Sequence, residues 1–104
     1  AGFDTYLKDP LGGMRVTPEG YAAMARILLN LADECCGGKL VVVLEGGYHV
    51  GGLTASVKAM LAEMSDETHV GEAKLAALED EADEHNADVI KRVISQQKMY
   101  WDVL

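Results

Sequence analysis

The chain is poor in cysteine, proline, tryptophan and phenylalanine, and it has no long apolar run. Its 104 residues include two cysteines, two prolines, one tryptophan and one phenylalanine. Cys35 and Cys36 are adjacent, so they offer neither a disulfide framework nor a metal-ligand spacing, and we expect a reducing, cytoplasmic setting. No apolar run approaches the length needed to cross a bilayer, and the amino end carries no signal-peptide pattern.

Basic residues are also scarce. The chain has nine lysines and arginines and 17 aspartates and glutamates, which gives a net charge of −8. This charge argues against binding to a nucleic-acid backbone. A chain of 104 residues forms one domain or less and can bury only a modest core.

The most informative stretch is apolar and short. Residues 40–44 read Leu-Val-Val-Val-Leu and run into Glu45, Gly46, Gly47 and Tyr48. An unbroken apolar run of this length predicts a strand buried on both faces, as in a parallel sheet covered by helices. Tyr48 would then lie at the carboxyl end of the strand, where α/β sheets place their ligand crevices. The plainer alternative is a strand, a turn and a core tyrosine.

Helix signals lie on both sides of this run. Thr17 as N-cap and Pro18 at the first helical position predict a helix to about Cys35, which Gly37-Gly38 would end. Its apolar stripe would be Tyr21, Met24, Ile27, Leu28, Leu31 and Cys35. A second helix is predicted from about Leu53 to Met64, with Leu53, Val57, Met60, Leu61 and Met64 facing inward.

The order of these elements predicts an α/β fold. Residues 1–4 resemble the last step of a strand, so strand, loop, helix, strand, loop and helix follow one another, and the two strands should be parallel. The segment 65–104 is rich in acidic residues, which predicts a linker or a solvated face. It should contain two more helices, about Glu72–Leu78 and Ala87–Val103. His69 and His85 should be solvated, and Trp101 should be a packing anchor.

Two residues at the predicted strand ends could carry chemistry. If the strands are neighbours, Asp4 and Tyr48 project into the same crevice. A carboxylate there can ligate a metal, and a phenol can donate a hydrogen bond to charge that develops on a carbonyl oxygen.

Four motifs in register make a family resemblance specific. They are Ala1-Gly2-Phe3-Asp4, Asp9-Pro10-Leu11-Gly12-Gly13-Met14, Thr17-Pro18-Glu19-Gly20-Tyr21 and Leu44-Glu45-Gly46-Gly47-Tyr48. Together they resemble the carboxy-terminal third of the zinc-dependent histone deacetylase family, which has an arginase-like α/β fold. The match covers residues 1–64, the carboxy-terminal part of the catalytic domain. Residues 65–104 would be an acidic linker and closing helices, similar to those of bacterial members.

The resemblance implies a role for each matching residue. Asp4 matches a metal-binding aspartate, and Tyr48 matches the catalytic tyrosine that polarises the substrate carbonyl. Gly46 and Gly47 match the loop beside the acetyl-lysine channel, and Leu11 matches a residue that lines it. The implied cofactor is zinc, with iron as the alternative, and the implied substrates are acetylated lysine or other acetylated amines.

The family's remaining metal ligands and its histidine pair have no counterpart among the three histidines. We therefore expect a carboxy-terminal fragment that is inactive alone and that self-associates, because a divided sheet leaves strand edges and apolar faces uncovered. Two alternatives remain open: part of an acetylpolyamine or other small-amide amidohydrolase, and a non-catalytic interaction module with an acidic helical tail. No contact with nucleic acid or membrane is expected.

Overall fold

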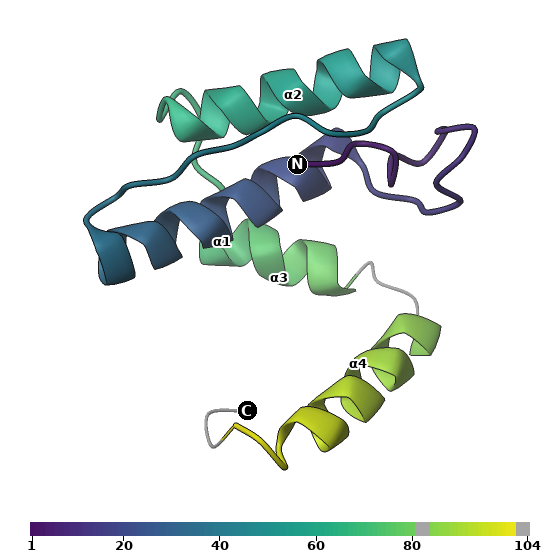
Figure 1. Cartoon of the computed structure of the whole chain (residues 1–104), viewed down its shortest axis with the longest axis vertical. Coiled ribbons are helices and arrows are strands. Elements are labelled where there is room, and N and C mark those ends of the chain that lie inside the picture. The colour runs from purple at the N-terminus through teal and green to yellow at the C-terminus, as the bar shows by residue number, and fades with distance from the viewer. Residues whose placement is uncertain (81–83, 102–104) are drawn as a thin grey trace. The chain divides into compact units, whose positions relative to one another are not determined.

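The computed structural model describes residues 1–80 and 84–101, without the side chains of residues 79 and 84–86. Over these residues the chain forms the helices α1 (Pro18–Cys36), α2 (Val50–Met64), α3 (Glu72–Asp80) and α4 (Glu84–Gln97) (Figure 1). The chain divides into two compact units, a first unit of residues 1–72 and a second unit of residues 73–104. In the described part of the chain, no helix is both long and apolar enough to span a membrane.

Helix α1 begins and ends where the sequence predicts. The Thr17 side chain accepts a hydrogen bond from Gly20 N–H at 3.2 Å, and Pro18 occupies the first helical position. At the other end, Gly37 adopts a left-handed conformation with φ 63° and ψ 42°. A residue without a Cβ adopts this conformation at little cost, so Gly37 ends the helix as expected.

Helix α2 begins three residues earlier than predicted, because His49 acts as its N-cap. The His49 side chain accepts a hydrogen bond from Gly52 N–H at 2.9 Å through Nδ1. Ser, Thr, Asp and Asn are the usual N-caps, so the pattern did not identify this histidine. The helix still ends at Met64, as predicted.

The buried residues of α1 and α2 are mostly small or polar rather than large and apolar. On α2 the buried residues are Gly52, Ser56 and Glu63, and a Cβ on Gly52 would overlap the Tyr6 ring. On α1 the buried residues are Tyr21, Ala22, Ala23, Ala25, Arg26 and Ala32. The predicted stripe of α1 is therefore wrong as a buried face: apart from Tyr21, its members Met24, Ile27, Leu28, Leu31 and Cys35 are all exposed.

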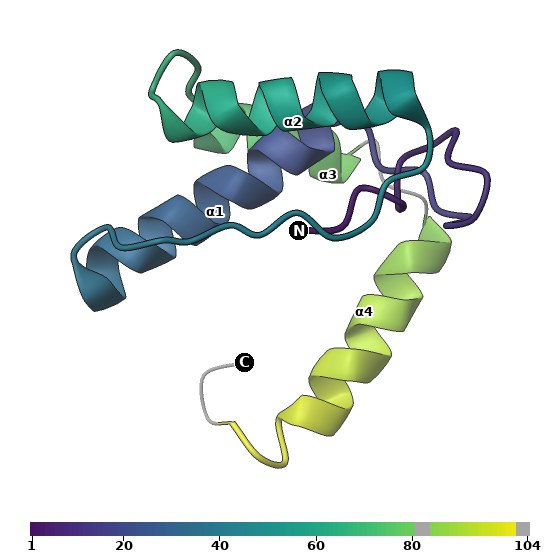
Figure 2. The ribbon, with the colours of Figure 1, turned by 45° about the horizontal axis from the view of Figure 1, so that its top comes forward.

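The predicted parallel sheet is wrong, because the described residues contain helices and no strand. Residues 37–49 run back along α1 as an extended segment with residues 1–3 beside it (Figure 2). The pairing is short: Ala1 N bonds to Val43 O, Glu45 N to Ala1 O and Phe3 N to Gly46 O. Beyond Gly46 the backbone N–H groups of Tyr48 and His49 donate to a side chain instead, so no continuous ladder forms.

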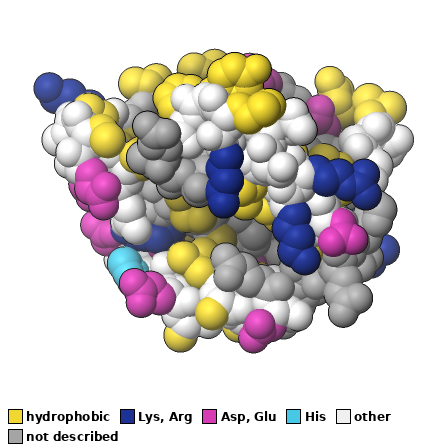
Figure 3. Space-filling view, turned by 90° about the horizontal axis from the view of Figure 1, so that it is seen from below, with side chains coloured by type: hydrophobic (Ala, Val, Ile, Leu, Met, Phe, Trp, Pro, Cys, Tyr) yellow, Lys and Arg dark blue, Asp and Glu magenta, His cyan; other side chains and the backbone are white. Residues whose placement is uncertain are grey.

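The apolar run 40–44 is consequently not buried on both faces. Val41 is 87% exposed, and Val43 and Leu44 are 66% and 60% exposed. On the face drawn in Figure 3, hydrophobic side chains lie at the surface among charged ones. Unit 1 thus combines a small packed interior with a large uncovered apolar area.

The second unit departs from the sequence prediction in its details. Helix α3 extends to Asp80, and α4 ends at Gln97, before the predicted end. Trp101 lies beyond α4 and is 60% exposed, and its role as a packing anchor stays a prediction. His69, in the first unit, is exposed as predicted, whereas the side chain of His85 lies outside the described residues.

Candidate functional site

Asp4 lies in a recess made by three glycines. A Cβ on Gly2 would lie 3.0 Å from Asp4 Oδ1, and a Cβ on Gly46 would lie 2.8 Å from Asp4 Oδ2. A Cβ on Gly12 would overlap the Asp4 backbone carbonyl oxygen. Gly2 and Gly46 therefore leave room for the partly buried carboxylate, and Gly12 leaves room for the Asp4 backbone.

The carboxylate of Asp9 joins the loop after residue 8 to the loop that carries Tyr48. Its Oδ1 accepts hydrogen bonds from Leu11 N–H at 2.9 Å and Gly12 N–H at 3.2 Å. Its Oδ2 accepts hydrogen bonds from Tyr48 N–H at 2.8 Å and His49 N–H at 3.2 Å. One side chain thus satisfies four backbone donors from two segments about forty residues apart in sequence.

These bonds favour the ionised form of Asp9. Burial acts to raise the pKa of its carboxyl, but the four N–H donors, from Leu11, Tyr48, Gly12 and His49, outweigh that effect and lower the pKa below the ordinary value of 3.8. The contact is therefore made by a carboxylate at neutral pH.

The predicted site residues lie in this cluster of loops. The Asp4 carboxylate lies beside Gly46, and Tyr48 follows two residues later with 59% of its surface exposed. The Leu11 N–H donates to the same Asp9 carboxylate as the Tyr48 N–H, and Leu11 is 71% exposed.

Gly47 is required for conformational reasons. Its φ of 140° is one that L-residues with a side chain rarely adopt, and a Cβ there would lie 3.0 Å from the Phe3 Cβ. The turn that presents Tyr48 to solvent therefore depends on this glycine.

The chemistry of Asp4 fits one ligand of a divalent metal ion, because a carboxylate in a preformed recess is a suitable oxygen donor. Within residues 1–80 and 84–101, however, no group of three His, Cys, Asp or Glu side chains could hold a metal ion. A catalytic zinc normally needs three protein ligands, so Asp4 can form only part of such a site.

Sequence reasoning missed Asp9 and His49. The bonds from Leu11 and Gly12 N–H to Asp9 are those of a local turn, which an Asp-Pro pair favours. The second pair of bonds to Asp9 comes from residues that no local pattern places nearby. His49 caps α2, and the centroid of its ring lies 5.2 Å from that of Tyr6, with the ring planes tilted by 39°.

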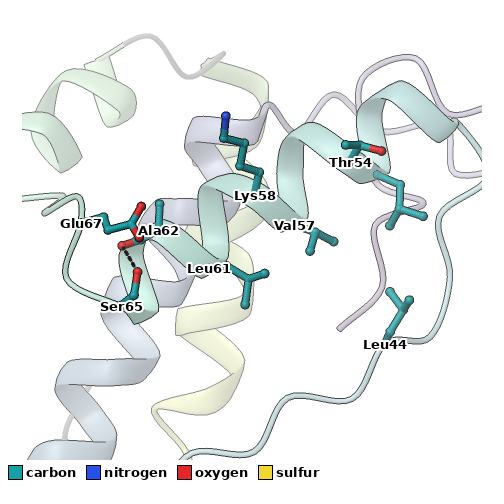
Figure 4. Close-up of a pocket in the computed structure, with 9 residues that line it drawn as sticks. Leu44, Thr54, Val57, Lys58, Leu61, Ala62, Ser65 and Glu67 are labelled. Atoms are coloured by element: carbon teal, nitrogen blue, oxygen red, sulfur yellow. Dashed lines mark hydrogen bonds between the residues drawn. The ribbon is translucent and has the colours of Figure 1, made fainter.

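Two apolar grooves of the first unit contain none of the predicted site residues. One, of about 700 Å³, lies along α2, where Leu44 faces Val57 and Leu61 (Figure 4). The other, of about 260 Å³, lies between α1, α2 and the extended segment and includes Phe3, Met24 and Val42. The candidate site is therefore distinct from both grooves, whose linings are mainly apolar.

Comparison with known proteins identifies the family. The family model described as the histone deacetylase domain matches residues 1–64, more than half of the chain. The chain belongs to the histone deacetylase domain family. It is 36% identical over 104 residues to histone deacetylase 15 of Arabidopsis thaliana, covering 100% of this chain and 18% of that protein. It is 34% identical over 113 residues to histone deacetylase 6 of Caenorhabditis elegans, covering 100% of this chain and 11% of that protein.

A solved histone deacetylase structure is also similar. The crystal structure of the HDA15 HD domain superimposes with a TM-score of 0.62 at 34% identity, covering 98% of this chain and 24% of that one. The family resemblance drawn from the four motifs is thereby confirmed. The chain spans less than a quarter of these proteins. Both named relatives are eukaryotic, so a bacterial-type member stays a prediction.

Proposed function

We propose that this histone deacetylase family chain supplies the catalytic tyrosine and one metal ligand of a metal-dependent deacetylase. The reaction would be hydrolysis of N-acetyl amides on lysine or related amines. The observation that carries this proposal is the position of the Asp4 carboxylate against Gly46, two residues before Tyr48, within the residues matched by the family model.

Each residue has a distinct proposed role. The Tyr48 phenol, exposed at the end of its loop, would donate a hydrogen bond to the substrate carbonyl oxygen as that oxygen gains negative charge. Leu11, Gly46 and Gly47 would line the channel for the acetylated side chain. Asp4 would hold the metal, zinc or iron, which supplies Lewis acidity when it is bound.

The proposal requires residues beyond this chain. Because Asp4 alone cannot complete a metal site, the chain by itself should not hydrolyse acetylated substrates. Activity would need a longer protein that contains residues 1–104 and supplies the remaining ligands and a general base.

The first test is Tyr48→Phe in that longer protein, assayed on an acetyl-lysine peptide. Removal of one oxyanion donor typically costs about 100- to 1000-fold in kcat. Tyr100→Phe is a matched control, because Tyr100 is 77% exposed and lies in the second unit. If Tyr48→Phe retained the wild-type rate, Tyr48 would not be the oxyanion donor.

The second test addresses the metal and the substrate. Asp4→Asn should reduce the zinc or iron bound per molecule, measured by elemental analysis after dialysis, because a neutral amide is a weaker ligand than a carboxylate. Unchanged metal content would remove Asp4 from the site. A panel of acetylated polyamines and acetyl-lysine peptides would then rank the substrates by kcat/KM.

A further inference from the structure

We infer that Asp9 is a positioning residue for Tyr48: through its two carboxylate oxygens it fixes the tyrosine loop against the turn that carries Leu11. This inference rests on the proposed role of Tyr48 and adds a residue to it. Asp9 is not proposed to touch the substrate.

The division of bonds between the two oxygens supports this role. Oδ1 is used by Leu11 and Gly12 of its own turn, and Oδ2 is used by Tyr48 and His49 of the distant loop. Tyr48 is thereby held through its backbone at 2.8 Å, while the residue as a whole remains 59% exposed. The phenol is thus free to meet a substrate although the loop beneath it is fixed.

The arrangement also relates the two sides of the proposed channel. The N–H groups of Leu11 and Tyr48 bond to the same carboxylate, so the spacing between their backbones is set by one rigid planar group. His49, the other residue held by Oδ2, caps α2. The loop is therefore fixed at Asp9 and at the start of the helix.

Both oxygens of a carboxylate accept hydrogen bonds, so Asp9 can serve all four donors. In Asp9→Asn one oxygen becomes an NH₂ group, which would face N–H donors and cannot accept from them. One of the two pairs of bonds must then be lost. A displacement of about 1 Å at a catalytic group can cost about 100-fold in rate.

The decisive experiment is a double-mutant cycle in the longer protein, with kcat and KM measured on an acetyl-lysine peptide. Asp9→Asn should lower kcat by about 10- to 100-fold with little change in KM. In a Tyr48→Phe background it should cost less than about threefold, because the group that it positions is already gone. Asp33→Asn, which changes an exposed carboxylate on α1, is the control and should have no effect.

The outcomes separate this inference from the proposed function. If Tyr48→Phe is inactive and Asp9→Asn has wild-type kcat, the positioning role fails alone. If Asp9→Asn costs the same with and without the Tyr48 hydroxyl, Asp9 acts through something else, and the inference is overturned. A wild-type rate for Tyr48→Phe would instead reject the proposed function.

A second measurement needs no variant. In the wild-type protein, the N–H groups of Tyr48 and His49 should be protected from hydrogen exchange, because each is hydrogen-bonded in a loop that is otherwise open to solvent. Exchange as fast as that of an unstructured peptide would show that the contact is not formed. This result would overturn the inference even if Asp9→Asn failed to fold.

Discussion

Arg26 and Glu63 form a buried ion pair between α1 and α2, with 2.6 Å between Arg26 Nε and Glu63 Oε1. Glu63 is fully buried, and Thr68 Oγ1 and Val70 N–H also donate to its carboxylate. The guanidinium reaches Asp66 as well, at 3.2 Å. A single acid on α2 therefore fixes α1 and the turn that follows α2.

Loss of this acid should destabilise the first unit. Glu63→Ala leaves buried donors without an acceptor, which typically costs about 1–3 kcal/mol of unfolding free energy. Urea unfolding of the chain would measure this change in unfolding free energy. Glu67→Gln, at an exposed position, is the control. Equal stability of Glu63→Ala and Glu67→Gln would mean that the pair contributes nothing.

The same residue predicts a dependence of stability on pH. Burial acts to raise the pKa of the Glu63 carboxyl, but hydrogen bonds from Val70, Thr68 and Arg26 outweigh it and hold the pKa below its ordinary value of 4.5. A lowered pKa stabilises the folded chain above pH 4.5, and this contribution disappears as the pH falls through the folded-state pKa.

Glu63→Gln removes this titration while keeping the shape of the side chain. Its unfolding free energy should therefore fall less steeply than that of the wild type as the pH is lowered below about 4.5. If the unfolding free energies of the wild type and Glu63→Gln changed equally with pH, the acid sensitivity would come from other groups.

His49 should be replaceable by asparagine but not by alanine. The His49 Nδ1 accepts the Gly52 N–H at the start of α2, and asparagine is also a favourable N-cap, whereas alanine cannot accept this bond. His49→Ala should cost about 1 kcal/mol of unfolding free energy relative to His49→Asn. Urea titrations of the two variants would measure the difference, and identical midpoints and slopes would exclude the capping role.

The uncovered apolar segment should make the isolated chain self-associate. Val41 and Val43 are 87% and 66% exposed, and an exposed, extended apolar segment readily pairs with a second copy. Light scattering should show a mass above 11.2 kDa that rises with concentration. The double variant Val41→Lys/Val43→Lys should lower this mass, whereas Val89→Lys on α4 should not. A concentration-independent monomer would contradict this prediction.

The sequence by itself determined the features that depend on near neighbours. Thr17, Pro18 and Gly37 set the ends of α1 because a cap bonds to backbone groups within about one helical turn. The four motifs were likewise sufficient to identify the family. Hydrophobic periodicity was not sufficient to identify the buried face of α1, because small residues such as Ala25 allow a helix to approach closely and the sequence does not name the partner.

The tertiary structure alone decided whether the run 40–44 pairs as a strand and where Tyr48 is held. The run 40–44 has a high strand propensity. The backbone N–H groups of Tyr48 and His49, which follow it, nevertheless bond to Asp9, 39 and 40 residues away in the chain, rather than to a neighbouring strand. Pairing of this kind depends on which groups meet in space, and a sequence pattern records only what is adjacent along the chain.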